Sequence, residues 1–315
     1  MLHTGGGSVR EARFALMKLP PAIIWWQSLR DAGGNWVSDR CATMAAAIAF
    51  YASFSLAPTL VIVIAVAGFA FGAEAVQGRL FKEIAGLTGP DGAHIIQAMV
   101  ASAWKAGNSG WSTAISIMAT IVGASATFSQ LHETVNQIWR APGAVPATTP
   151  VTLWQSVKSF FRVRLMSFGL VLGIGFLMLV LLVLDAGVSV AIEWLWGADG
   201  LLLLAKQATV MALLSAVFAI LLRLLPDQRP RWRDVLAGAI VAAALFTGGK
   251  HLFGLYLARA GTANAFGAAG SLAVVLMWLF YSAAVFLFGA EFAAAWTRLC
   301  ASAKAAATAA PKATN

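Results

Sequence analysis

Ionisable side chains are rare in this sequence, and the few that lie in or beside its long apolar runs are those that could do chemistry. Asp, Glu, Lys and Arg make up 11% of the residues, against roughly 25% in soluble domains. Lys250 and His251 form one such pair, His132 and Glu133 form a second, and Glu291 stands apart. Ionisable groups at membrane depth are costly and often functional, so these positions are candidates for holding or gating a ligand.

Each position also has an ordinary structural explanation. Lys250 stands sixteen residues after Asp234, which is about 24 Å along a helix and places it in the outer part of a bilayer. It either snorkels to the outer surface or faces a cavity and holds an anionic headgroup. Glu133 and Glu291 follow apolar runs at the inner interface, where a carboxylate is easily hydrated, so we expect both to be solvated or ion-paired.

The first apolar run contains a further candidate group. Pro58 follows Ser53 and Ser55 by about one helical turn, a combination that kinks a helix and frees backbone carbonyls. Such breaks occur at transport sites, although many serve only packing. The complete set of candidate substrate or gating residues is Lys250, His251, Tyr51, Ser55, Pro58, Glu291 and Glu133.

Residue sets for hydrolysis, phosphoryl transfer or metal binding are missing from the sequence. It contains no GxxxxGK[ST], HExxH or paired CxxC motif. The four histidines, His3, His94, His132 and His251, lie in four different segments, and no two have metal-ligand spacing. We therefore expect no catalytic residue, no cofactor and no metal, and we do not expect an enzyme.

Six apolar runs must position the candidate side chains. A bilayer core of about 30 Å requires ~20 apolar residues as a helix. Runs that meet this length lie within residues 42–71, 109–130, 165–184, 201–222 and 271–290. A further run has only fifteen residues between Asp234 and Lys250, but its apolar character resumes through Leu257, so 234–257 is also predicted to span. With 60% hydrophobic residues, the sequence predicts an all-α, polytopic membrane protein with six transmembrane helices.

The segments around these runs complete the predicted organisation. Residues 74–108 alternate apolar and polar residues at helical spacing around a turn signal at 88–92, which predicts a helical hairpin on the outer face. Residues 1–41 form an N-terminal segment whose helix at 22–32 is either interfacial or a linker packed on the bundle. The membrane domain then spans 42–300, and the Ala-rich tail at 301–315 is expected to be disordered. The Gly-rich stretch 261–270 is either a flexible outer connection or a non-helical re-entrant element.

The positive charges indicate the orientation. Sixteen of the 22 Lys and Arg residues lie in the N-terminal segment, between spans 2 and 3, between spans 4 and 5, and in the C-terminal tail. By the positive-inside rule both termini are cytoplasmic. This topology already explains the net charge of +9, so we expect no nucleic-acid partner. No cleavable signal peptide is recognisable, and span 1 is expected to direct insertion.

Several stretches match a known family in order and spacing. They are DRCATMAAAIAFYASFSLAPTLVIVIAVAG, ATFSQLHETVNQIWRAP, RVRLMSFGLVLGIGFLML, LLPDQRPRWRDVLAGAI, KHLFGLYLARAG and FGAAGSLAVVLMWLFYSAAVFLFGAE. Together they resemble the YihY/BrkB family of bacterial inner-membrane proteins, historically mislabelled ribonuclease BN. The resemblance implies six helices with cytoplasmic ends in the bacterial inner membrane, and a connection with envelope integrity and lipid or glycolipid movement.

Three functional hypotheses follow. The first is a transporter-like protein that handles a lipid, glycolipid or other amphiphile, with membrane lipids and an anionic lipid or glycolipid as ligands. The second is a scaffold that recruits envelope-assembly partners or forms a homo-oligomer. The third and weakest is a membrane-associated ribonuclease, because no metal cluster is available for phosphodiester hydrolysis.

Overall fold

The fold is helical throughout the part of the chain that the structure describes. The structure is a computed structural model, and it describes residues 21–106, 126–140, 200–228, 230–260 and 262–309. The helices are α2 (Pro21–Ser38), α3 (Cys41–Phe71), α4 (Ala73–Ala106), a helix over residues 126–139, α7 (Gly200–Leu224), α8 (Trp232–Ala260) and α9 (Thr262–Ala309). Within these ranges there is no strand, which confirms the all-α prediction for them.

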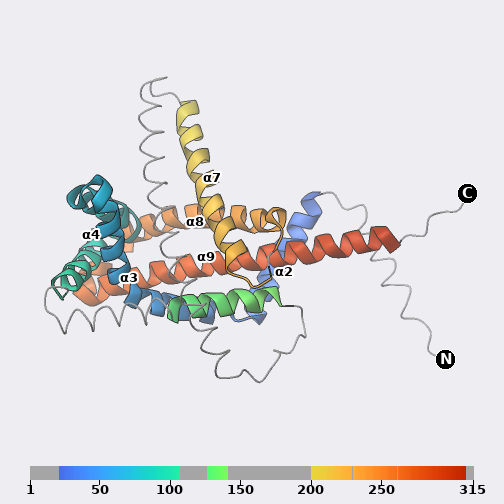
Figure 1. Cartoon of the computed structure of the whole chain (residues 1–315), viewed down its shortest axis with the longest axis horizontal. Coiled ribbons are helices and arrows are strands. Elements are labelled where there is room, and N and C mark those ends of the chain that lie inside the picture. Colours follow the sequence, from blue (N-terminus) through green and yellow to red (C-terminus); the bar gives the residue numbers. More distant parts are fainter. Residues whose placement is uncertain (1–20, 107–125, 141–199, 229, 261, 310–315) are drawn as a thin grey trace, which may run out of the picture.

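Helix α9 is the element around which the others are arranged. It packs against α8, α2, α3 and α4. Figure 1 shows α8 lying along α9, α3 and α4 gathered toward one end, and α2 crossing nearer the other end. Helix α9 has 48 residues, which corresponds to about 72 Å. It therefore extends well beyond a bilayer core of about 30 Å.

Three described helices are long and apolar enough to cross a membrane. Their qualifying segments are Gln207–Leu224, Trp232–Tyr256 and Gly270–Ser302. A fourth span results if Ile23–Ser38 and Cys41–Ala57, which meet at a bend of 68°, are counted as one. The predicted spans 4, 5 and 6 are thus helices of suitable length. The predicted span at 165–184 and most of that at 109–130 lie outside the described residues, so the number six stays a prediction.

Helix α4 is interrupted where the sequence predicted a turn. Gly89 has φ 80° and ψ 168°, and Pro90 follows it. Such a positive φ is accessible to glycine and strained for other residues. Side chains from both halves of α4, including Ile84 and Ile96, pack in one apolar cluster with residues of α3 and α9. The break is observed, whereas the position of this element on the outer face stays a prediction.

Both ends of α9 extend into segments that were expected to be irregular. Residues 262–270 form its first turns, so the expectation of a flexible or non-helical stretch is wrong for them. At the other end α9 continues to Ala309, into the tail for which disorder was expected. Alanine is the strongest helix former, and it is frequent in both segments.

Small residues bring α8 and α9 into close contact. A Cβ atom on Gly238 would collide with the carbonyl oxygen of Gly289 and would lie 2.7 Å from the Cβ of Ala293. Further along, Gly249 lies against the ring of Tyr281, whose hydroxyl donates a hydrogen bond of 2.6 Å to a carbonyl of α8. Small residues at helix crossings allow the dense backbone packing that holds membrane helices together.

Replacing Gly238 with Ala should destabilise the protein. The new methyl group meets the backbone of α9, which cannot move aside as a flexible side chain does, so we expect a loss of about 1–3 kcal/mol. The matched control is Gly248→Ala, because nothing lies within 4 Å of a Cβ at that position. Thermal unfolding in detergent should show a lower midpoint for Gly238→Ala and an unchanged or higher one for Gly248→Ala. Equal midpoints for the two variants would contradict this packing.

Candidate functional site

Helix α2 packs one face on α9 and leaves aromatic surface on the other. The ring of Trp25 lies 5.0 Å from that of Phe292 and 5.7 Å from that of Trp296, measured between centroids. Ala32, two turns further along the same face, is fully buried. Trp26, in contrast, is 69% exposed. The helix is packed on the bundle, which is one of the two arrangements predicted from the sequence. It also exposes an indole, a side chain that is enriched at membrane interfaces.

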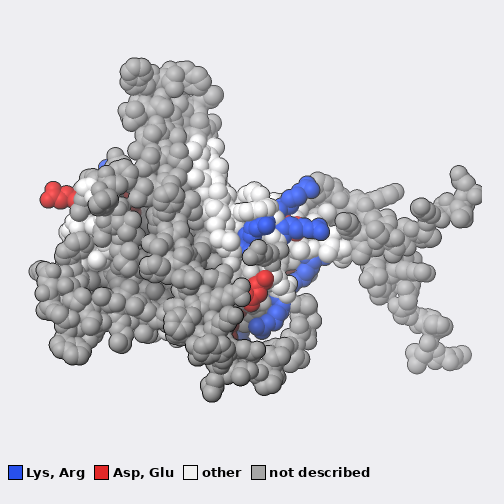
Figure 2. Space-filling model, viewed as in Figure 1, with Lys and Arg blue, Asp and Glu red and all other residues white. Residues whose placement is uncertain are grey.

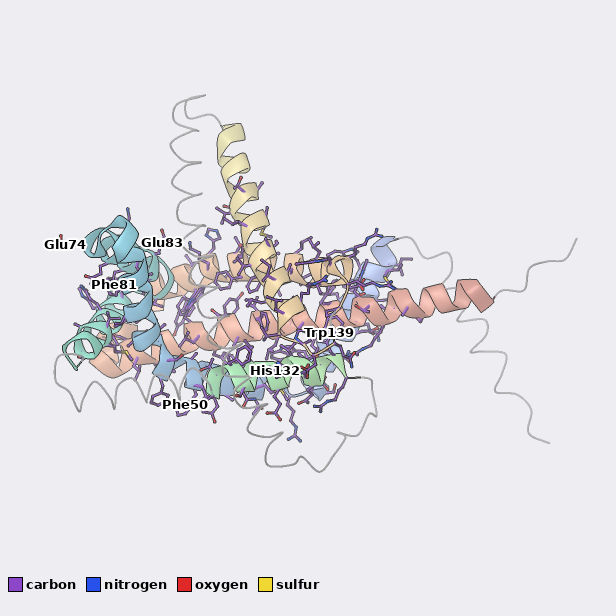
Figure 3. All side chains as sticks on the ribbon, viewed as in Figure 1. Phe50, Glu74, Phe81, Glu83, His132 and Trp139 are labelled. Carbon is purple, nitrogen blue, oxygen red and sulfur yellow. The ribbon has the colours of Figure 1, made fainter. Side chains whose placement is uncertain are left out.

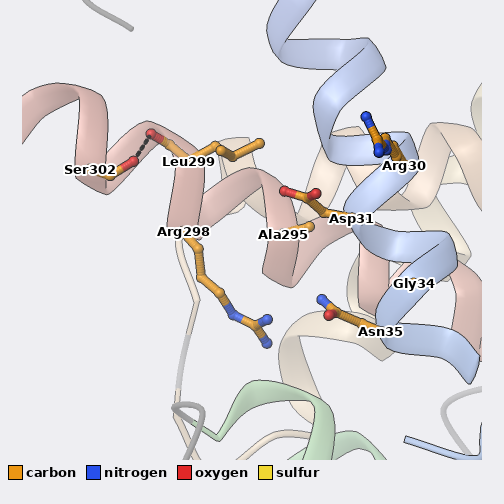
Figure 4. A pocket seen from close by; sticks show the side chains of 8 residues that line it. All are labelled: Arg30, Asp31, Gly34, Asn35, Ala295, Arg298, Leu299 and Ser302. Carbon is orange, nitrogen blue, oxygen red and sulfur yellow. Dashed lines mark hydrogen bonds between the residues drawn. The ribbon is translucent and has the colours of Figure 1, made fainter. Parts of the chain in front are cut away.

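An open pocket of about 560 Å³ lies where α2 passes over α9. Its lining comes from Arg30, Asp31, Gly34 and Asn35 of α2 and from Ala295, Arg298, Leu299 and Ser302 of α9. Figure 4 shows the side chains of Arg298 and Asn35 pointing into the same space from facing helices. Two guanidinium groups and one carboxylate give the lining a net positive charge. Arginine donors match phosphate and carboxylate geometry, so the pocket is suited to an anionic group.

The bend between α2 and α3 positions this region. Arg40 has φ 55° and ψ 38°, and it is the one non-glycine with positive φ among the described residues. This left-handed residue ends the turn after α2 and starts α3 at Cys41. The thiol of Cys41 is buried and donates a hydrogen bond of 3.6 Å to Oε1 of Glu291. The bend therefore brings the start of α3 onto a carboxyl group of α9.

Glu291 is fully buried, so the expectation of a solvated or ion-paired side chain is wrong. Its exposed fraction is 0%, and its Oε2 atom has no hydrogen-bond partner among the described atoms. Asp39 and Arg298 are its charged neighbours, and the Asp39 carboxyl group lies within hydrogen-bonding reach, so the two acids could share a proton. Arg298 donates a hydrogen bond of 2.7 Å to the carbonyl of Ile138, and no described cation lies within 4.0 Å of the carboxylate. The apolar runs predicted that Glu291 lies at the end of the last span, where water would reach it. In the structure α9 continues to Ala309, so residue 291 lies well inside the helix.

The other predicted residues do not converge on one place. Lys250 and His251 are exposed on α8, Glu133 is exposed on the 126–139 helix, and Tyr51, Ser55 and Pro58 lie along α3. Tyr51 is 37% exposed beside Phe50, which Figure 3 shows at the edge of the molecule. The hydroxyl of Ser55 donates to the carbonyl of Ala52 at 3.1 Å, within its own helix. Helix α3 continues through position 58, and gating roles for these residues stay predictions.

A polar junction that the sequence did not reveal ties the 126–139 helix to the connection between α7 and α8. The amide of Asn136 donates to Oδ2 of Asp227 and accepts from its backbone N–H, each at 2.9 Å. His132 completes the junction, with Nδ1 2.7 Å from the carbonyl of Leu225 and Nε2 3.1 Å from the amide nitrogen of Asn136. The same Nε2 atom lies 3.6 Å from Oδ1 of Asp227. The only signal in the sequence is the spacing of His132 and Asn136, one helical turn apart.

Comparison with known proteins identifies the family. The family model described as Virulence factor BrkB matches residues 32–314. The chain belongs to this family. Among BrkB relatives, the UPF0761 membrane protein of Methylibium petroleiphilum is 25% identical over 274 residues, which cover 86% of this chain and 62% of the relative. The UPF0761 membrane protein of Alkalilimnicola ehrlichii is 27% identical over 295 residues, covering 91% and 62% respectively.

These comparisons confirm the resemblance noted from the sequence and the assignment as a membrane protein. This BrkB chain spans 62% of the length of those two relatives, and no solved structure matches it. The names of the family and of these two relatives denote a virulence factor and membrane proteins, and none of them denotes an enzymatic activity. Within the described ranges, no three His, Cys, Asp or Glu residues are grouped so that they could hold a metal ion.

The polar junction can be tested with a double-mutant cycle. Asn136→Ala removes both hydrogen bonds, whereas Asp227→Ala removes only the one to Oδ2, because the backbone N–H of residue 227 remains. The side-chain bond that both variants lose should make their effects on unfolding non-additive, with a coupling energy of about 1 kcal/mol. Thermal unfolding of the two single variants and the double variant measures this term. Gln137→Ala with Asp227→Ala is the control pair, because adjacent helical residues face different directions. Additive effects in both pairs would show that the junction does not form.

Proposed function

We propose that this BrkB-family chain is a non-enzymatic protein of the bacterial cytoplasmic membrane that binds and moves an amphiphile with an anionic, phosphate-bearing headgroup. The amphiphile is a lipid or a glycolipid, and its movement supports envelope integrity. The observation that carries the proposal is the pocket between α2 and α9, into which Arg30 and Arg298 bring positive charge. Trp26, one helical turn before Arg30, supplies an exposed indole near the pocket.

The chemistry of the pocket supports a headgroup as its ligand. A guanidinium forms paired hydrogen bonds with phosphate oxygens. The carboxylate of Asp31 can accept hydrogen bonds from the hydroxyl groups of a glycerol or sugar, and Asn35 offers both a donor and an acceptor. Acyl chains would remain in the lipid alongside the exposed aromatic surface of α2.

The distribution of charge supports an orientation for the protein. Figure 2 shows most of the Lys and Arg side chains visible on this face gathered around α2 and the adjacent part of α9. Glu74 and Glu83 lie at the opposite end of the molecule (Figure 3). By the positive-inside rule the α2 end faces the cytoplasm. A headgroup in the pocket would then come from the inner leaflet, and both termini would be cytoplasmic.

Lipid retention in native nanodiscs tests the proposal. Mass spectrometry of co-purifying lipids should show an enriched anionic lipid or glycolipid with the unmodified protein and about tenfold less with Arg30→Gln, since a charge-assisted hydrogen bond contributes about 1.5 kcal/mol. The control is Arg233→Gln, which removes the same charge from an exposed position on α8. Equal retention by all variants would contradict the proposed pocket.

Two further outcomes distinguish the competing hypotheses. Loss of the lipid in Lys250→Ala but not in Arg30→Gln would indicate that the ligand binds at α8. Lys250 would then hold the anionic headgroup in a cavity, which is one of its two predicted roles. Only bulk lipid in every sample, with a stoichiometric protein partner, would favour the scaffold.

A further inference from the structure

Glu291 is a buried acid that the proposed function leaves without a role. One carboxyl oxygen accepts a hydrogen bond from the thiol of Cys41, and the other receives no hydrogen bond from a donor among the described atoms. The carboxyl group of Asp39 lies within hydrogen-bonding reach of the Glu291 carboxyl group. The side chain has no exposed surface. Burial strongly disfavours an unpaired ionised carboxylate, whereas the protonated form carries no charge to desolvate.

The charged neighbours of Glu291 act on its carboxyl group in opposite directions. Among the described residues, Asp39 before α3 and Arg298 on α9 act on it electrostatically, and Cys41 is its titratable hydrogen-bond partner. Asp39 would repel a second negative charge. Arg298 would attract one, but it is held by the carbonyl of Ile138 on the 126–139 helix. The residues that helix α8 contributes to the same core are apolar, namely Val235, Ala239, Ala242 and Ala243, with Phe246 packed against them.

We propose that Glu291 is a proton-binding site, protonated in the described conformation, whose deprotonation draws Arg298 away from the Ile138 carbonyl. In this step the carboxyl O–H bond breaks, the proton passes to water, and the carboxylate becomes an acceptor for the guanidinium of Arg298. Arg298 also lines the pocket between α2 and α9. The protonation state of Glu291 therefore changes the positive charge that the pocket offers. This link to headgroup binding rests on the proposed function, whereas the proton site itself does not.

Infrared spectroscopy of the full chain in nanodiscs tests the proton site. At neutral pH the unmodified protein should show the carbonyl stretch of a protonated carboxyl group, and alkaline titration should remove it. The band should be absent in Glu291→Gln, which keeps the shape of the neutral side chain. It should persist in Glu83→Gln, the control, which changes an exposed carboxylate on α4. Cys41→Ala should shift its frequency, because the thiol donates to this carboxyl group.

The outcomes are decisive in either direction. A spectrum without a protonated-carboxyl band at neutral pH would overturn the proposal, and so would a band that Glu291→Gln leaves in place. If Glu291→Gln does not fold, the frequency of the carboxyl band in Cys41→Ala tests the proposal instead. A band at the same frequency as in the unmodified protein would show that Glu291 is not its source.

Coupling to the ligand has a separate readout. Lipid retention in nanodiscs should change between acidic and alkaline pH in the unmodified protein and should be independent of pH in Glu291→Gln. A band that behaves as expected, with no lipid retained at any pH, would refute the proposed function and leave the proton site standing. Retained lipid without the band would refute the proton site alone.

Discussion

The close approach of α8 and α9 through Gly238 and Gly289 is the contact on which the rest of the described structure depends. In a bilayer the hydrophobic effect does not drive helices together, so dense packing between small residues must do so. Once this pair is formed, the remaining faces of α9 are open to α2, α3 and α4. The long C-terminal helix thus provides the common surface on which the N-terminal helices assemble.

The sharp bend at Arg40 brings polar side chains of α2 and α3 next to those of α9. Because α2 and α3 meet at 68°, α2 crosses α9 and lines the open pocket with it, while the start of α3 covers Glu291. Arg298 belongs to both places, since it lines the pocket and is a charged neighbour of the buried carboxyl group. Although the chain has few charged residues, two arginines, Arg30 and Arg298, and three acids, Asp31, Asp39 and Glu291, lie around a single helix crossing.

The sequence predicted the elements better than it predicted the site. Apolar length alone indicated α7, α8 and the central part of α9, and the Gly-Pro signal indicated the break at Gly89. Helix faces were harder to predict, because one residue along a helix rotates a side chain by about 100°. The sequence indicated how deep in the bilayer Lys250 lies, but not the helix face on which it lies. In the structure Gly249 is buried against Tyr281, and Lys250 is exposed. The pocket was missed because its two arginines are far apart in the chain and positive charge near span ends is already explained by topology.

The central claim is that this BrkB-family protein moves an amphiphile with an anionic headgroup, and lipid movement in proteoliposomes tests it most directly. Purified protein would be reconstituted into vesicles that contain fluorescent anionic or zwitterionic lipid in the inner leaflet, and the appearance of label in the outer leaflet would be followed with a membrane-impermeant quencher. A proton gradient would be applied in parallel. The account predicts faster movement of the anionic lipid than in protein-free vesicles. Rates equal to those of protein-free vesicles for every lipid class, with and without the gradient, would contradict it.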